Sequence, residues 1–406
     1  MEVVYPRCAG LDVHSRRISA CARVVTERGV DREVCTFGSS TRELRALADW
    51  LEARGCTHVA MESTGVYWKP VWHVLEGRFE LVLANATQVR NMPGRKSDVS
   101  DATWIAELLA HGLIRPSFVP PAPVQELRDL TRTRKQLVRE ISRHTLRIHK
   151  ILEDANIKLT SVLSSVLGKS GRAVLGALIN GETDPERLAA LTSGRLKASR
   201  EELVEALRGT VSDHHRFMLK LHLDQIEQLE RAVHEVEERA RRAPFRAAVE
   251  LLSTIPGVSE TTAMVIVGEI GDDMRRFPTA GHLLSWAGLC PRLDESAGKR
   301  LSNRTRRGAP WLKTVLVQAA WPASTKRGSY FRSRFLRLKA RRGPKKAVVA
   351  VAASILTAAY YMLKTGAEYH DLGADHFDRL DRAKATDRLV RRLTALGYTV
   401  RLEPAA

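Results

Sequence analysis

The sequence has few cysteines, and their arrangement argues against two common kinds of site. Among 406 residues there are only five cysteines, and none stands in a Cys-x-x-Cys pair. A scattered, odd-numbered set is not typical of a disulfide framework or a zinc site. We therefore expect reduced thiols and a cytoplasmic protein. The N-terminus has no basic segment followed by an apolar core, so no signal peptide is predicted.

Long hydrophobic runs are also scarce. The one exception is residues 347–363, which contain 17 consecutive residues without a charge. This length is at the lower limit for a membrane-spanning helix, and the segment is rich in alanine. We expect a buried helix here and no association with a membrane.

Acidic residues are missing from a long C-terminal stretch. From Lys299 to Lys364 there are 17 Lys or Arg residues and no Asp or Glu. The chain has a formal net charge of +19, of which residues 1–121 contribute only +1. A solvated surface normally mixes both signs, so such a one-sided segment indicates contacts with phosphates. The charge distribution predicts a neutral N-terminal domain followed by basic regions that bind nucleic acid.

The apolar pattern of the N-terminal region predicts an α/β domain. Its elements follow the order βββ–α–β–α–β–α. Strands are expected over 7–13, 18–25, 33–37, 58–61 and 79–83. Helices are expected over 41–54, with Thr41 as the cap, and over 66–75 and 97–110. Three hairpin-connected strands followed by α/β units are typical of the ribonuclease H-like plan, a mixed sheet covered by helices. We expect this domain to span residues 1–121, because four prolines lie between 116 and 123.

The remainder of the chain is predicted to be mostly helical. Long helices over 124–155 and 199–241 enclose shorter helices over 156–195, in a region assigned to 122–243. The long helices indicate either a coiled-coil dimerisation arm or a solvated spacer, and the pattern favours neither. A C-terminal domain is expected over 244–366, followed by a charged tail over 367–406.

One turn in the C-terminal domain has two explanations. Residues 255–259, Ile-Pro-Gly-Val-Ser, resemble the turn of a helix-hairpin-helix motif, in which backbone N–H groups contact a phosphate. Ser259 stands where that motif usually has a second glycine. A plain turn between two core helices accounts for the same residues.

Four carboxylates stand where the predicted topology would bring them together. Asp12 ends the first strand, Glu62 follows the fourth, and Asp98 and Asp101 lie three residues apart at the start of the last predicted helix. An unpaired charge in an apolar strand is costly, so Asp12 and Glu62 require a partner. Hard oxygen ligands suit Mg²⁺ or Mn²⁺, and two such ions can stabilise both oxygens of a phosphoryl transfer. Asp98 and Asp101 also have a simpler explanation, which is stabilisation of a helix N-terminus.

Several segments resemble one family of mobile-element enzymes. Three acidic segments are similar to the motifs of the DEDD transposases of the insertion sequence 110 family: 10–14 (GLDVH), 61–65 (MESTG) and 96–102 (KSDVSDA). Further segments are similar to that family's C-terminal transposase domain: 255–258 (IPGV), 287–291 (AGLCP), 296–299 (SAGK) and 307–308 (RG). The similarities occur in the family's order, from about residue 8 to residue 365.

The resemblance implies a DNA recombinase with a RuvC-like domain that binds two divalent ions through those four acids. It also implies a catalytic serine, for which Ser296 is a better match than Ser302. The family motif Ser-Gly-Gly is Ser-Ala-Gly here. By analogy, Ser296 would attack a scissile phosphate, giving a DNA–phosphoserine link and a free 3′-hydroxyl. Without the resemblance, Ser296 would be interpreted as an ordinary loop serine.

The resemblance also implies several partners. These are target and donor DNA, a structured non-coding guide RNA (a bridge RNA), and further copies of the chain in a dimer or tetramer. The basic residues expected to contact nucleic acid are Lys96, Arg128, Arg132, Arg134, Lys135, Lys299, Arg300, Arg304, Arg306 and Arg307.

Two other functions fit the sequence. A metal-dependent nuclease or junction resolvase would use the same four acids, with water as the nucleophile and Ser296 inert. A non-catalytic nucleic-acid scaffold would use only the basic helices, and it would keep its activity after Asp12→Ala and Glu62→Ala.

Overall fold

The chain forms two compact units, Met1–Val119 (unit 1) and Pro120–Ala406 (unit 2). A computed structural model describes residues 2–63, 65–86, 89, 92, 100–193, 198–291, 294–302, 304–306, 308–380 and 382–403. The division between the units falls inside the proline-rich segment that was predicted to end the first domain.

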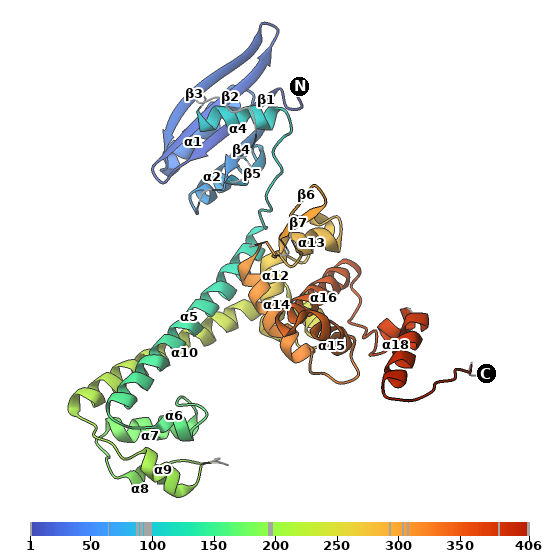
Figure 1. Cartoon of the computed structure of the whole chain (residues 1–406). Coiled ribbons are helices and arrows are strands. Elements are labelled where there is room, and N and C mark those ends of the chain that lie inside the picture. The colour runs from blue at the N-terminus through green and yellow to red at the C-terminus, as the bar shows by residue number, and fades with distance from the viewer. Residues whose placement is uncertain are drawn as a thin grey trace. The chain divides into compact units, whose positions relative to one another are not determined.

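Unit 1 is built on a mixed five-stranded sheet (Figure 1). The strand order is β3-β2-β1-β4-β5, where the strands are β1 (Arg7–Val13), β2 (Arg17–Thr26), β3 (Gly29–Gly38), β4 (His58–Glu62) and β5 (Glu80–Ala84). The first three strands are antiparallel neighbours joined by short turns, whereas β4 and β5 run parallel to β1. Parallel strands need a crossover, and helices supply it here. The predicted ribonuclease H-like plan is confirmed.

Alternate residues of β1 face two different helical layers. Helices α1 (Thr41–Ala53) and α2 (Trp68–Leu75) share a core with Ala9, Leu11 and Val13. Helix α4 (Asp101–Ala110) covers the opposite face, where the Cys8 thiol donates to the carbonyl oxygen of Ala106 at 3.6 Å. Side chains alternate along a strand, so Asp12 belongs to the face that α4 covers.

Helix α4 approaches the sheet very closely at Gly10. A Cβ atom at this position would lie 2.2 Å from the carbonyl oxygen of Ala102 and 2.3 Å from the backbone nitrogen of Ala106. Only glycine leaves room for the helix backbone at this distance. The contact therefore fixes the height and the register of α4 over β1.

Three predicted boundaries in unit 1 were inaccurate. The cap of α1 is Ser40 rather than Thr41, because the Ser40 side chain accepts the N–H of Glu43. The helix predicted to start at residue 97 starts at Asp101, because Ser100 is extended and its hydroxyl accepts the N–H of Thr103 at 3.3 Å. Strand β3 is longer than predicted, because it pairs with β2 along its whole length.

Unit 2 begins with two long helices that lie side by side. They are α5 (Ala122–Asp154) and α10 (Asp213–Arg241) (Figure 1). Arg134 bonds to Glu237 near one end of the pair and His215 bonds to Asp154 near the other, so the helices are antiparallel. Shorter helices pack in a separate core with the C-terminal part of α5, and these are α6 (Leu159–Val162), α7 (Lys169–Ile179), α8 (Pro185–Ala190) and α9 (Arg200–Ala206).

The segment predicted as one helix over 199–241 is two helices, so that prediction was wrong. Ser199 caps α9 and Ser212 caps α10, each in a capping box. Between these helices, a Cβ atom on Gly209 would lie 2.3 Å from the carbonyl oxygen of Ala155 at the end of α5. The chain therefore turns closely around the end of α5, which helical periodicity alone did not reveal.

The second core of unit 2 surrounds one apolar helix, α16 (Pro344–Thr365). Its other elements are α11 (Arg246–Ser253), α12 (Glu260–Ile270), the 3-10 helix η1 (Met274–Arg276), α13 (Ala280–Trp286), α14 (Pro310–Ala323) and α15 (Tyr330–Arg342). By length and composition α16 could cross a membrane, but Val351, Ile355 and Tyr360 are buried in this core, as the sequence predicted. The tail contains α17 (His376–Leu380) and α18 (Arg382–Ala395).

Replacing Gly10 by alanine should lower the melting temperature of unit 1. The added methyl group requires α4 to move away from β1, and overpacking of this kind costs about 1–3 kcal/mol. Gly176 in α7 is the matched control, since nothing lies within 4 Å of a Cβ there. Calorimetry of the full chain measures both variants. A Gly10→Ala transition as high as that of the wild type would contradict the close packing.

Candidate functional site

Asp12 and Glu62 occupy neighbouring positions at the ends of two parallel strands. The last paired residues of β1 and β4 are Leu11 and Met61, and each acid is the next residue along its strand. Residues in parallel register point to the same face of a sheet, so both acids belong to the face covered by α4. The Asp12 side chain is 22% exposed, and its Oδ2 atom lies 3.2 Å from Nε2 of His14.

The N-terminal end of α4 lies toward these two acids. Cys8 contacts Ala106, Gly10 lies against Ala102 and Ala106, and the backbone N–H of Val4 donates to Ala110 at 2.8 Å. Helix α4 is therefore antiparallel to β1, and its first residue is Asp101. An acid in the first turn also stabilises the helix dipole, so the position of Asp101 is consistent with both of its predicted roles.

The four predicted acids differ in how far the structure describes them. Asp12 and Glu62 are neighbours in the sheet, and Asp101 is the first residue of α4, which covers their face. Asp98 and Lys96 lie outside the described residues. Within the described part of the chain, no three His, Cys, Asp or Glu side chains are grouped so as to hold a metal ion. Carboxylate oxygens are nevertheless the ligands that Mg²⁺ and Mn²⁺ prefer. The convergence of all four acids stays a prediction.

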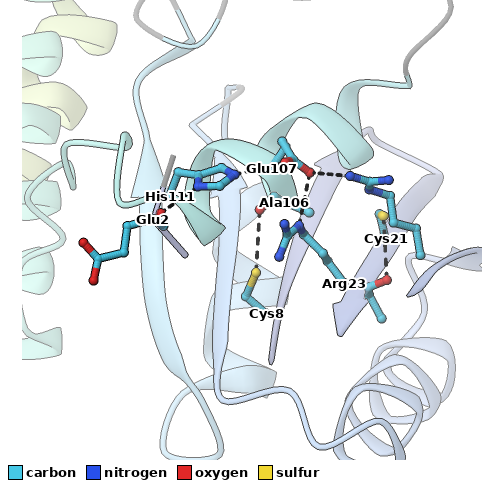
Figure 2. Close-up of polar contacts among 9 residues, drawn as sticks. Glu2, Cys8, Cys21, Arg23, Ala106, Glu107 and His111 are labelled. Carbon is cyan, nitrogen blue, oxygen red and sulfur yellow. Dashed lines mark hydrogen bonds and ion pairs between the residues drawn. The ribbon is translucent and has the colours of Figure 1, made fainter. Parts of the chain in front are cut away.

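A partly buried ion-pair network holds the other end of α4 to the sheet (Figure 2). Arg23 in β2 is 2% exposed, and its Nε donates to Glu107 at 3.1 Å. Arg32 in β3 donates to the same carboxylate at 2.9 Å, and Nε2 of His111 lies 3.1 Å from its second oxygen. Burial opposes the charge on Glu107, but the two guanidinium groups outweigh it and lower the pKa of Glu107 to about 2.

This network was not predicted from the sequence, although the sequence contains a signal for it. Arg23 interrupts the apolar strand Ile18–Val25 just as Asp12 interrupts β1. The same rule, that a charge in a buried strand needs a partner, would have selected it. Its partner Glu107 lies on α4, 84 residues away in sequence. Spacing patterns do not reveal a pair that is so far apart in the chain.

Ser296 is the last residue of a short strand that enters a tight hairpin. Strand β6 (Asp294–Ser296) pairs with β7 (Lys299–Ser302), and Lys299 lies directly opposite Ser296. Ala297 and Gly298 form the turn with φ values of 48° and 74°. Two successive positive φ values are typical of a type I′ hairpin turn, which favours glycine at both positions. The Ser-Gly-Gly pattern would therefore fit this turn with less strain than Ser-Ala-Gly.

Ser302, the alternative nucleophile, has a local structural role. Its hydroxyl accepts the backbone N–H of Arg304 at 3.2 Å, just after the end of β7. The backbone around Ser296 shows that this residue ends a paired strand and is not an ordinary loop serine.

The base of this hairpin is held by two glycines in contact. A Cβ atom on Gly288 would lie 2.8 Å from the carbonyl oxygen of Arg306, and one on Gly308 would lie 2.4 Å from that of Ala287. Lys313 in α14 donates to the carbonyl oxygen of Gly288 at 3.1 Å and to the hydroxyl of Thr305 at 2.7 Å. Gly288 and Gly308 thus have a physical explanation, since they let two irregular backbone segments approach closely at the base of the hairpin.

Comparison with known proteins places both ends of the chain in one family. A DEDD-type model described as a transposase matches residues 9–157. A second model, described as "Transposase IS116/IS110/IS902 family", matches residues 249–336. Together the two models cover more than half of the chain.

The chain belongs to the IS110 family of transposases.

Three curated relatives are similar to this transposase. An uncharacterized IS110 insertion-element protein of Streptomyces coelicolor is 32% identical over 34% of this chain and 35% of its own length. The pilin gene-inverting proteins of Moraxella bovis and Moraxella lacunata are 24% and 23% identical, over 81% and 87% of this chain and 88% and 95% of their own lengths. Members of this transposase family carry out phosphoryl transfer on DNA, and the DEDD domain implies the use of divalent metal ions.

Three basic residues predicted to contact nucleic acid also form hydrogen bonds or ion pairs within unit 2 of the transposase. Arg128 donates to two carbonyl oxygens near the C-terminal end of α12, those of Gly268 and Glu269, at 2.9 and 2.8 Å. Arg132 makes a two-point ion pair with the buried Glu269 carboxylate at 2.8 and 2.9 Å, and Arg134 pairs with Glu237 on α10. The nucleic-acid contacts expected of these three residues stay a prediction, and burial of the Arg128 side chain against α12 lowers its pKa.

The other predicted basic residues lie on exposed surface or outside the described side chains. Lys135 is half-buried on α5. Lys299 is exposed in the hairpin of β6 and β7 (the serine hairpin), and Arg304 and Arg306 are exposed just after it. The side chain of Arg300 and the whole of Arg307 are outside the described part of the structure.

The helix-hairpin-helix-like turn of the transposase has a packing role. Gly257 has φ of 85°, and a Cβ atom there would lie 2.4 Å from the carbonyl oxygen of Ala319 in α14. Ser259 caps α12 by accepting the N–H of Thr262 at 3.3 Å. The plain turn between core helices, one of the two explanations of this sequence, therefore accounts for both Gly257 and Ser259.

Glu107→Gln should destabilise unit 1 near neutral pH by about 1.5–3 kcal/mol, because it removes the charge that two guanidinium groups share. The folded-state pKa of Glu107 lies below its ordinary value of 4.5, at about 2. Its stabilising effect is therefore complete above about pH 4.5 and is lost as the pH falls toward 2. Calorimetry should show a melting-temperature difference from wild type at pH 7 that shrinks in acid.

The control for this experiment is the exposed pair between Glu52 and Arg78. Glu52→Gln should change the melting temperature little, because surface ion pairs are screened by solvent. A pH-independent difference for Glu107→Gln would show that the charge of Glu107 is not the stabilising feature.

Proposed function

We propose that this transposase cuts and rejoins DNA through a covalent link to Ser296, at a phosphate held by two Mg²⁺ or Mn²⁺ ions. The ligands of these ions would be Asp12, Glu62, Asp98 and Asp101. The observation that carries the proposal is the adjacent register of Asp12 and Glu62 on the face of the sheet covered by α4, with the first residue of α4 directed toward them.

Asp12 and Glu62 together form an acidic edge of the sheet, and carboxylate oxygens of this kind attract divalent cations. Two carboxylates at neighbouring strand ends repel each other, and a divalent ion relieves that repulsion. Bound ions would neutralise the phosphate and stabilise the attacking and leaving oxygens of the transfer. Asp98 enters the proposal through its position in the 96–102 segment of the sequence.

Ser296 would act as the nucleophile in two balanced transfers. In the first, the Ser296 oxygen forms a bond to phosphorus as the bond from phosphorus to the DNA 3′-oxygen breaks. The serine loses its proton, and the departing 3′-oxygen takes one up as a hydroxyl. In the second, a 3′-hydroxyl attacks the phosphoserine and releases Ser296, so the number of phosphodiester bonds is conserved without ATP.

The hairpin supports this role through charge and position. Lys299 lies opposite Ser296 in register, and Arg304 and Arg306 are exposed nearby in sequence. Cations beside the nucleophile would neutralise the phosphate oxygens as the new bond forms. Arg300 and Arg307 are assigned the same role from their place in the sequence.

The partners proposed are target and donor DNA, a structured non-coding bridge RNA that pairs with both, and further copies of the chain. Support comes from family membership and from the charge of +19, concentrated after residue 121. The name of the Moraxella relatives, which invert a pilin gene, is consistent with recombination between two DNA sites.

The proposal predicts a protein–DNA adduct that depends on Ser296. The full transposase is incubated with Mg²⁺, a nicked DNA substrate containing the element's ends and the non-coding RNA, and then denatured. Wild type should give a band of covalently linked protein and DNA, Ser296→Ala should give none, and Ser302→Ala should still give it. Ser302 is the matched control because it lies on the partner strand of the same hairpin.

Each other outcome contradicts part of the proposal. An adduct that survives in Ser296→Ala but disappears in Ser302→Ala would move the nucleophile to Ser302. Unchanged cleavage without any adduct in Ser296→Ala would favour the metal-dependent nuclease, in which water attacks.

A further inference from the structure

A groove in unit 2 lies between α5, α12 and α14, and no residue of the β6–β7 hairpin lines it. Its volume is about 520 Å³, within the roughly 300–1,000 Å³ typical of small-ligand sites. Its walls combine basic side chains, one aromatic ring and hydroxyl groups, and the residues that matter here are Arg132, Lys135, Arg139, Thr261, Trp311 and Gln318.

The groove carries positive charge that no residue in the described part of the chain neutralises. Arg132 and Arg134 line it but are paired with Glu269 and Glu237. Lys135 and Arg139 also line it, and neither forms an ion pair with any residue that the structure describes. Two cations on one wall of a concave site favour an anionic ligand.

Trp311 supplies an aromatic surface beside these cations. The guanidinium carbon of Arg139 lies 5.4 Å from the centre of the Trp311 ring, and that of Arg132 lies 5.5 Å from it. Arg132 is fixed in place, because its guanidinium makes two bonds to Glu269, which is only 2% exposed. The ring is therefore held in a defined position, half-exposed to the groove.

We infer that this groove binds one unpaired nucleotide of a nucleic-acid strand. The base would stack on the Trp311–Arg139 pair, and its phosphate would contact Lys135 and Arg139. Bases in a duplex are already stacked on one another, so an aromatic side chain in a concave site is suited to a base that has left the stack. Both single-stranded DNA and single-stranded RNA present such a base and phosphate.

The groove is linked to the serine hairpin through α14. Trp311 lies in the first turn of that helix, and Lys313, two residues later, bonds to the base of the hairpin. A strand anchored in the groove would thus be held by the helix that also supports Ser296. The inference needs a nucleic-acid partner but goes beyond the proposed cleavage chemistry.

Binding is measured by fluorescence anisotropy with labelled single-stranded DNA and RNA. The full transposase carries Ser296→Ala, and EDTA is present, so binding is tested without cleavage. Trp311→Ala should weaken binding about tenfold or more, the effect expected for loss of one stacked base. Trp321→Ala is the matched control, since Trp321 lies on the same helix and is 47% exposed, and it should leave the affinity unchanged.

The charge of the groove is tested by salt dependence. Arg139→Gln should reduce the slope of log K against log salt by about 0.7, the value for one contact with a single strand. Arg143→Gln on α5 is the control, because Arg143 pairs with Glu140 on the helix surface and should leave the slope unchanged.

Several results would overturn the inference. One is an equal loss of affinity in Trp311→Ala and Trp321→Ala. Another is a loss of affinity for duplex DNA but for neither single strand. The third is an unchanged slope of log K against log salt in Arg139→Gln. If Trp311→Ala does not fold, Trp311→Phe and Trp311→Leu replace it. Phenylalanine should keep more affinity than leucine, and equal affinities would contradict stacking. Failure of the Ser296 adduct would leave these results unaffected.

Discussion

The contact between α4 and Gly10 is the constraint on which the candidate catalytic site depends. Because glycine has no Cβ, the helix backbone reaches the strand backbone, and the helix register is fixed by main-chain atoms at Ala102 and Ala106. The ion pairs of Glu107 hold the far end of the same helix. With both ends fixed, the start of α4 is directed to the edge where Asp12 and Glu62 end their strands. An acidic site assembled from segments distant in sequence needs such rigid support.

Much of unit 1 could be predicted because its physical signals are local. Apolar alternation and short turns located five strands in the correct order, and charge within an apolar strand singled out Asp12. The start of α4 was missed because a serine inside a helical pattern does not reveal whether its hydroxyl faces solvent or caps the helix, as Ser100 does. Arg23 was missed because its partner lies on another element. Local patterns show that a buried charge needs a partner but not which residue provides it.

Unit 2 shows the same limit for basic residues. A run of cations on α5 predicted phosphate contacts, but Arg128 and Arg132 bind the end of α12 and Arg134 binds α10. Sequence alone could not separate structural from exposed cations, because the acids that neutralise them lie more than 100 residues away. The glycines at 288 and 308 were recognised by resemblance, and their physical reason is the close approach of two backbone segments at the base of the hairpin. In this chain, glycines of the family-like segments thus serve packing.

The central claim, that the four acids share divalent ions, is tested most directly by counting bound Mn²⁺. Electron paramagnetic resonance of the full transposase with DNA reports free and bound Mn²⁺ separately. The account predicts two tightly bound ions per active site in the wild type and a loss of tight binding in Asp12→Asn, Glu62→Gln, Asp98→Asn and Asp101→Asn. Wild-type Mn²⁺ binding in all four variants would contradict it.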